Sequence, residues 1–156
     1  MQSLKLEPDW TFVCDRVMGG ASSGAVSHET VAGREAARMT GRVSLDNDGG
    51  FIQIAFDLAR GVKPEEWTGI ELDLLGNDEA YDVRLRTTQL TRPWQSFRAE
   101  VVVPARWTRH RLPFAAFAPH RTEQTFDPAS FRRIGLLAIG RVFEADLSVS
   151  YVGLYR

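Results

Sequence analysis

The stretch that decides the fold is IELDLLGNDEAYDVRLRT, at residues 70–87. On both sides of the turn sequence GND, at residues 76–78, apolar side chains alternate with charged ones. The apolar side chains that share a face are Ile70, Leu72 and Leu74 before the turn, and Tyr81, Val83 and Leu85 after it. Alternation with a period of two is typical of a β-strand that turns one face to a core. The stretch therefore predicts two strands, each with one buried face and one polar face.

The same pattern continues through the rest of the chain. FRAEVVV, at residues 97–103, alternates in the same way, and further candidate strands lie at residues 36–45, 51–58, 107–114, 134–140 and 147–155. Turn-forming residues separate them, and DNDGG at residues 46–50 predicts a hairpin turn. Only residues 63–67 and 127–133 favour a helical turn. Many short strands without long amphipathic helices predict an all-β fold, an antiparallel β-sandwich.

Length and composition narrow the class of protein. A chain of 156 residues favours one domain, residues 1–156, which is large enough to fold without disulfides. The net charge of −1 gives no overall attraction to nucleic acid. Cys14 is the only cysteine, which excludes an internal disulfide and a cysteine-based metal cluster. No stretch approaches the roughly 20 apolar residues of a membrane span, and no leader pattern is present, so we expect a cytoplasmic protein.

Charge is unevenly distributed along the sequence. Acidic residues outnumber basic ones in residues 1–83, and basic residues outnumber acidic ones in residues 84–156. We expect the two halves to interleave in one fold and to pair their charges, because opposite charges normally mix on a protein surface. The alternative is that the uneven distribution marks a binding surface.

The glycine-rich stretch DRVMGGASSG, at residues 15–24, raises the question of a phosphate-binding loop. Such a loop lies between a strand and a helix and has a defined spacing of glycines and lysine, and this stretch has neither the spacing nor the lysine. We predict a tight turn in which glycine takes a positive φ. Its functional role would be to shape the rim of a binding cleft, with Met18 filling either the core or the mouth of that cleft. The residues of this rim are Asp15, Arg16, Met18, Gly19, Gly20 and Ser22.

No catalytic set is apparent in the sequence. His28, His110 and His120 lie far apart, and no serine lies in a G-x-S-x-G motif. The carboxylate of Asp15 beside Cys14 disfavours the thiolate that a nucleophile needs, so we expect Cys14 in the core. We therefore predict a protein that is not an enzyme and holds neither a cofactor nor a metal.

The polar faces of the central strands are the most informative surface. We expect strands 70–75, 81–87 and 97–103 to lie side by side, with Glu71, Asp73, Arg84, Arg86 and Arg98 on one surface. One interpretation is a network of cross-strand ion pairs, each worth up to about 1 kcal/mol. The other is a binding face for a peptide or a sugar, with Trp94 and Gln95 of the loop RPWQS at its rim.

Several motifs together carry a family resemblance. They are WxxxxDRVMGGxS from Trp10 to Ser22, TGRVSLDNDGGF at 40–51, WTGIELD at 67–73, YDVRLRT at 81–87, WxxxxLPFxxFxP from Trp107 to Pro119, and the closing segments IGLLAIG and LSVSYVGLY. In these motifs the chain resembles the complex I intermediate-associated protein 30 family over nearly its full length. The resemblance implies a galactose-binding-like jelly-roll sandwich. It also implies a non-enzymatic role, since the mitochondrial members of the family are assembly factors for respiratory complex I.

The leading hypothesis is a non-enzymatic binding or assembly module. It holds a protein partner, with respiratory-complex subunits or assembly factors as candidates, through the arginine-rich face and the rim loops. The alternative is a carbohydrate-binding domain in which Trp94 stacks on a small sugar bound at the same face.

Overall fold

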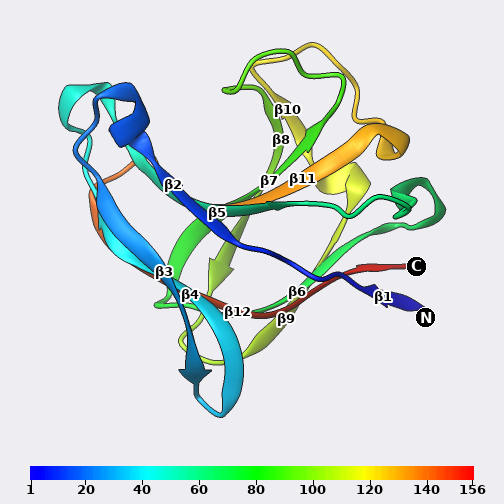
Figure 1. Cartoon of the computed structure of the whole chain (residues 1–156), viewed down its shortest axis with the longest axis horizontal. Helices are drawn as coiled ribbons and strands as arrows, with labels where there is room; N and C mark the ends of the chain where they lie inside the picture. Colours follow the sequence, from blue (N-terminus) through cyan, green and yellow to red (C-terminus); the bar gives the residue numbers. More distant parts are fainter.

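The computed structural model describes residues 1–156 as two antiparallel sheets packed face to face (Figure 1). Sheet A has the strand order β3-β4-β12-β6-β9, with β1 also paired to β12, and sheet B has the order β10-β8-β7-β11-β5-β2. The strands of sheet A are β1 (Ser3–Lys5), β3 (Ser23–Val31), β4 (Arg34–Val43), β6 (Gly69–Leu75), β9 (Thr108–Pro113) and β12 (Phe143–Tyr155). The strands of sheet B are β2 (Thr11–Cys14), β5 (Phe51–Asp57), β7 (Glu79–Thr87), β8 (Ser96–Val103), β10 (Ala118–His120) and β11 (Phe131–Ile139). This architecture confirms the predicted antiparallel β-sandwich.

The helical content is confined to short 3-10 turns. They are η1 (Asp15–Met18), η2 (Asp46–Asp48), η3 (Pro64–Glu66), η4 (Phe114–Ala116) and η5 (Pro128–Ser130). η3 and η5 lie within residues 63–67 and 127–133, where the sequence favours a helical turn. No helix in the structure is long and apolar enough to cross a membrane.

The two strands of the opening stretch do not lie side by side, which corrects the sequence-based prediction. β6 pairs with β12 and β9 in sheet A, whereas β7 pairs with β8 and β11 in sheet B. The chain passes from one sheet to the other at residues 76–78, where the N–H of Gly76 donates to the Pro104 carbonyl at 2.8 Å. Because both strands turn their apolar face to the same core, alternation alone does not reveal which sheet each joins.

The hairpin predicted at residues 46–50 is also wrong. This segment connects β4 of sheet A to β5 of sheet B, so it crosses between layers. Three of its residues have positive φ: Asn47 and Asp48 at 57°, and Gly50 at 145°. Asn, Asp and Gly serve a sharp crossing as well as a hairpin, because both need left-handed backbone conformations.

β3 is the longest strand that the sequence analysis does not identify. All nine of its residues pair with β4, and its other edge is free of strand partners. Most of its side chains are exposed, so the apolar alternation that identifies a half-buried strand is weak there. The sequence also does not identify β1, β2 and β10, because strands of three or four residues are too short to show alternation.

The core lies between the sheets and is built from the alternating apolar faces. It includes Tyr81, Val83 and Leu85 of β7 together with Ile70, Leu72 and Leu74 of β6, all of them buried. Cys14 is buried at the edge of this core, as expected.

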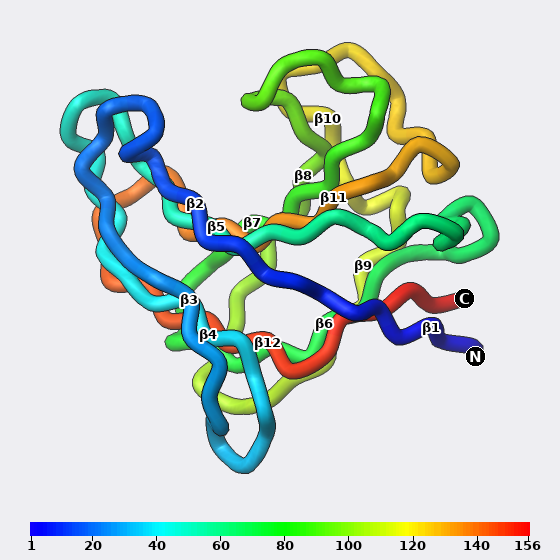
Figure 2. Tube along the Cα trace, in the orientation of Figure 1, coloured from blue at the N-terminus to red at the C-terminus, as the bar shows by residue number.

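The two chain ends lie side by side (Figure 2). β1 pairs with the end of β12, and Gln2 and Arg156 exchange backbone hydrogen bonds of 2.8 and 3.0 Å. This pairing fixes the first and last residues to sheet A.

The glycine-rich turn wraps around a carboxylate of the protein itself. Asp15 is fully buried, and its two oxygens accept hydrogen bonds from the Ser22 N–H (3.0 Å), the Ser22 hydroxyl (2.5 Å), the Gly50 N–H (2.5 Å) and the Phe51 N–H (3.2 Å). A Cβ on Gly20 or Gly49 would collide with this carboxylate, so both positions require glycine. Gly19 has a φ of 86°, which confirms the predicted positive-φ turn.

The acidic first half and the basic second half interleave and pair, as expected. Carboxylates from residues 1–83 bind arginines from residues 84–156 in both sheets. These pairs are Asp57–Arg133, Glu71–Arg111, Asp73–Arg109, Glu79–Arg141, and Asp82 with Arg84 and Arg98.

Replacement of Asp15 by asparagine tests the importance of the buried carboxylate. We expect Asp15→Asn to lower the free energy of unfolding by about 2–3 kcal/mol, because an amide presents a donor to N–H groups that need an acceptor. Asp46→Asn, in the exposed turn next to it, is the control and should change stability by less than about 0.5 kcal/mol. Urea unfolding near neutral pH measures both. A decrease in the free energy of unfolding no larger than that of Asp46→Asn would contradict the role given to Asp15.

The stability supplied by Asp15 is expected to depend on pH. Burial alone raises the pKa of this carboxyl, but the hydrogen bonds from Ser22, Gly50 and Phe51 outweigh it, so the pKa lies below its ordinary value of 3.8. A lowered pKa in the folded state gives a contribution that is full above the unfolded pKa and is lost as pH falls through the folded pKa. The stability difference between wild type and Asp15→Asn should therefore hold at neutral pH and shrink below about pH 4.

Candidate functional site

The outer surface of sheet B carries three of the predicted site residues, Arg84, Arg86 and Arg98. We call its outward-facing polar side chains on β7, β8, β10 and β11 the arginine face: Asp82, Arg84, Arg86, Ser96, Arg98, His120 and Arg133. Register places them in rows across the strands, with Arg84 opposite Arg98 and Arg86 opposite Arg133. Figure 1 shows the loops around η1 and η2 at one end of this surface and the β7–β8 connection at the other.

Asp82 organises the centre of the arginine face. Its side chain is only 3% exposed although it points away from the core between the sheets. Arg84 donates to it through Nε (3.1 Å) and Nη2 (2.9 Å), and Arg98 approaches it at 3.2 Å through Nε and 3.3 Å through Nη2. One carboxylate therefore fixes two guanidinium groups and leaves an excess of positive charge.

Arg86 holds the loop that carries Trp94. Its Nη1 lies within hydrogen-bond distance of the carbonyls of Arg92 (3.0 Å), Pro93 (2.8 Å) and Gln95 (2.7 Å). The amide oxygen of Gln95 accepts from the N–H groups of Thr91 and Arg92, so this predicted contact residue is engaged in shaping its own loop. The loop places Trp94 in solvent, where the residue is 54% exposed, and the Arg92 guanidinium lies 5.9 Å from the centre of its ring.

Two polar residues of the glycine-rich motif are buried, so they can shape the predicted rim only from inside the turn. Asp15 and Ser22 are fully buried and bonded to each other, and Arg16 donates to the Ser22 carbonyl at 2.8 Å. Met18 fills neither the core nor a cleft mouth but is exposed at the tip of η1, next to exposed Val17. Asp15 and Ser22 fix this turn in place from inside the protein.

Glu71 and Asp73 belong to a different surface from the arginines predicted beside them. Both lie on the outer surface of sheet A, where Arg111 contacts Glu71 at 3.0 Å and Arg109 contacts Asp73 at 2.7 Å. Burial raises the pKa of Glu71, but hydrogen bonds from Ser3 and Arg111 and the charge of Arg109 hold it below its ordinary value. The reason for the wrong placement is the passage of the chain from sheet A to sheet B between β6 and β7.

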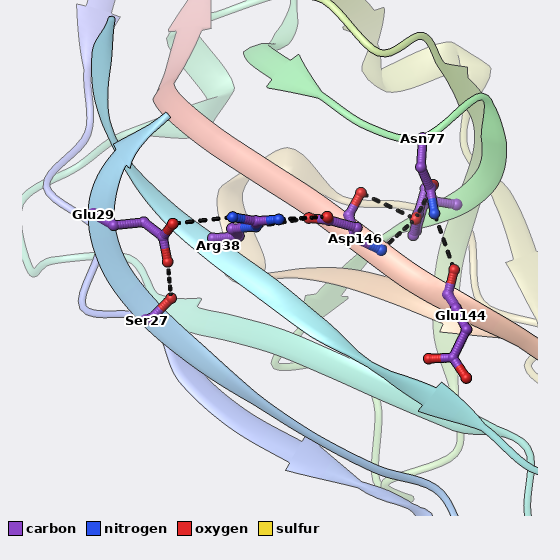
Figure 3. Close-up of polar contacts among 7 residues, drawn as sticks. Ser27, Glu29, Arg38, Asn77, Glu144 and Asp146 are labelled. Carbon is purple, nitrogen blue, oxygen red and sulfur yellow. Dashed lines mark hydrogen bonds and ion pairs between the residues drawn. The ribbon is translucent and has the colours of Figure 1, made fainter. Parts of the chain in front are cut away.

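The outer surface of sheet A is a network of ion pairs (Figure 3). Arg38 of β4 bridges Glu29 of β3 at 3.0 Å and Asp146 of β12 at 2.7 Å, and Ser27 supports Glu29. Asn77 connects the Glu144 carbonyl to the Tyr81 hydroxyl at the end of the same row. The interpretation as a cross-strand ion-pair network is therefore confirmed for sheet A.

Two surface hollows lie away from the arginine face. One, of about 210 Å³, is lined by Arg34, Asp73, Trp107, Thr108 and Arg109, and its charged groups bind one another. The other, of about 250 Å³, lies between the β1–β2 connection and strands β4 and β12. Asp73 is the only predicted site residue in either hollow.

Sequence reasoning missed Ser96, His120 and Arg133 as members of the arginine face. Ser96 stands one residue before the predicted strand 97–103, and its alternation with Phe97 is the signal that places it on the polar side. His120 lies in the short strand β10, which pairs with β8 and carries no alternation of its own. Burial lowers the pKa of His120, and Arg84, Arg98 and Arg121 lower it further.

The fold defines the class of protein as a galactose-binding-like β-sandwich, the architecture of known carbohydrate-binding modules. The family 11 module from Clostridium thermocellum, in complex with a β-1,3-1,4-mixed-linked tetrasaccharide, matches with a TM-score of 0.77 and 12% identity, covering 98% of this chain and 95% of that chain. The family 30 module of the cellulosomal cellulase Cel9D-Cel44B of Clostridium thermocellum matches with a TM-score of 0.64 and 15% identity, covering 99% and 97%. At these identities the likeness concerns the fold alone.

The sequence decides the family within that class. The family model for Complex I intermediate-associated protein 30 (CIA30) matches residues 2–149. The chain therefore belongs to the CIA30 family, which confirms the resemblance carried by its motifs. A sequence comparison with individual curated proteins finds no match.

Arg86→Ala tests whether this arginine holds the Trp94 loop. We expect amide hydrogen exchange at residues 91–95 to become faster by about tenfold or more, because three carbonyls lose their common donor. Arg42→Ala, on the outer surface of sheet A, is the control and should leave exchange in the loop unchanged. Equal exchange in both variants would contradict the role given to Arg86.

Proposed function

We propose that the chain is a non-catalytic binding module that holds a protein partner on the arginine face. The observation that carries the proposal is Arg86, the only partly buried arginine without a carboxylate partner. A cation kept half-buried without a counter-charge is costly in the free protein and is suited to an interface that supplies the missing charge. Arginine is also enriched at the centres of protein interfaces.

The family supports a partner that belongs to an assembly pathway. Its description refers to intermediates of respiratory complex I, so subunits of a respiratory complex or other assembly factors are the partner class we propose. The two sheets differ in a way that favours sheet B for this role. On sheet A the arginines that face outward are paired with carboxylates, whereas on sheet B Arg86 is not.

The carbohydrate-binding alternative rests on Trp94. It is the only aromatic residue among the exposed large apolar side chains, and an exposed indole beside planar polar groups can stack on a sugar ring. One structure with the same fold holds a mixed-linked tetrasaccharide. Against this alternative, the floor of the arginine face has charged side chains where a sugar platform would use further aromatic rings.

Charge reversal on the arginine face tests the proposed protein partner. We expect Arg84→Glu with Arg86→Glu to abolish capture of specific partners from a lysate of the native host, read by mass spectrometry. Arg60→Glu with Arg106→Glu is the matched control, since both arginines are exposed and unpaired in loops outside sheet B's outer surface. Circular dichroism checks that both double variants fold. Capture that persists in the folded Arg84/Arg86 variant would overturn the role of this face.

Fluorescence titration with the β-1,3-1,4-mixed-linked tetrasaccharide tests the alternative. Stacking on Trp94 predicts a saturable change in tryptophan emission that Trp94→Ala removes. No change up to millimolar sugar, or a change that survives in Trp94→Ala, would count against a sugar site at Trp94.

A further inference from the structure

Ser96 presents a buried hydroxyl that lacks a hydrogen-bond partner. The residue is 4% exposed, and its Oγ is one of only two buried side-chain oxygens left unbonded, the other being that of Ser148. Its side chain belongs to the outer surface of sheet B, since the next residue, Phe97, points into the core. Buried hydroxyl groups normally have partners, so this one requires an explanation.

The register of sheet B places this hydroxyl between two cationic or basic side chains. His120 of β10 is directly opposite Ser96. On the other side, Arg84 is opposite Arg98 and Leu85 is opposite Phe97, so Arg86 is opposite Ser96. The hydroxyl therefore lies in a row with Arg86 and His120, about one strand spacing of 4.8 Å from each neighbouring strand.

Arg86 is also incompletely bonded. Only its Nη1 makes hydrogen bonds, all to carbonyls of the Trp94 loop, which leaves Nε and Nη2 free. Burial lowers the pKa of its guanidinium, and the charge of nearby Arg133 lowers it further. The unbonded nitrogens and the lowered pKa both indicate that the Arg86 cation is desolvated and is repelled by Arg133. A bound anion would stabilise it.

The neighbouring carboxylates are already engaged elsewhere. Asp82 binds Arg84 and Arg98, and Asp57 binds Arg133 at 3.0 Å. Glu100 lies opposite Asp82, at the far end of the face from the Ser96 row, and is exposed. The protein itself thus provides no anion to the Arg86–Ser96–His120 row.

We infer that Arg86, Ser96 and His120 form a binding site for a carboxylate, supplied by an acidic side chain of the protein partner. The inference rests on the proposed function and adds the chemistry that the partner presents. The Ser96 hydroxyl and the free nitrogens of Arg86 donate to the carboxylate oxygens, and a ring N–H of His120 adds a third donor. Because the hydroxyl is covered in the free protein, the carboxylate displaces a covering side chain when it binds.

The spacing of the arginines also defines the partner segment. Arg84 and Arg86 are two residues apart on β7, about 6.6 Å along the strand, which equals the distance between alternate side chains of an extended peptide. An extended segment that runs along β7 therefore meets both arginines with acidic residues at alternate positions. The arginine face selects such a segment by charge and by spacing.

The test uses a short blocked peptide of alternating glutamate and serine, with a glutamine–serine peptide as the neutral probe. We expect the glutamate peptide to bind in the millimolar range or tighter. Binding should shift the NMR signals of the Ser96 amide, the Arg86 side-chain N–H and the His120 ring, and raise the pKa of His120. The neutral peptide should shift none of them.

Ser96→Ala is the decisive variant because it removes only the unbonded hydroxyl. We expect it to retain or raise Tm, since no hydrogen bond of the free protein is lost, and to weaken peptide binding by about fivefold or more. Ser148→Ala is the matched control: it removes the other unbonded hydroxyl, in sheet A, and should leave binding unchanged. Arg86→Gln should abolish binding.

Three results would overturn the inference. They are the absence of shifts at Arg86 and Ser96, equal affinity in Ser96→Ala and wild type, and binding of inorganic phosphate or trigalacturonate in place of the glutamate peptide. Partner capture that depends on Arg84 and Arg86 while the peptide fails would leave the proposed function in place and reject the carboxylate site. Peptide binding without any captured partner would support the site and reject the proposed protein-binding role.

Discussion

The buried carboxylate of Asp15 is the interaction on which one whole end of the sandwich depends. Two connections that cross between the sheets meet at this side chain: β2 to β3 through η1, and β4 to β5 through η2. A third crossing, between β11 and β12, joins them through the hydrogen bond from the Gly140 N–H to the Gly50 carbonyl. Backbone N–H groups thus do surround an anion here, but that anion is Asp15 of the chain itself, and the glycine-rich turn supplies only the Ser22 N–H while the β4–β5 connection supplies those of Gly50 and Phe51.

Much of the fold could be predicted from the sequence, because alternation records which side chains face the core. It identified the long half-buried strands, including β7 and β8, and the motifs from Trp10 to the end of the chain together identified the family. Alternation does not record which of two sheets a strand joins, since both sheets face the same core. For that reason Glu71 and Asp73 were assigned to the surface of Arg84, although β6 lies in the other sheet.

The candidate site was predictable only in part, for a related reason. Arg84, Arg86 and Arg98 follow from alternation along two strands. Ser96 and His120 could not be assigned to the site from the sequence, because only the pairing of β8 with β10 brings them together. That the Ser96 hydroxyl lacks a hydrogen bond can be recognised only from the positions of all its neighbours. The outer surfaces of the two sheets have similar residue types, but they differ in how completely their charges are paired. Sheet A neutralises its own charges, whereas sheet B retains a half-buried cation at Arg86.

The pairing of β1 with the end of β12 brings both chain ends to one corner of sheet A. The arginine face is on the outer surface of the opposite layer. Any segment attached at either end, whether a neighbouring domain, a tag or a surface anchor, would therefore leave from the same corner and away from the proposed site. Adjacent termini of this kind suit a domain that is inserted within a larger chain, because the proposed binding surface then stays exposed.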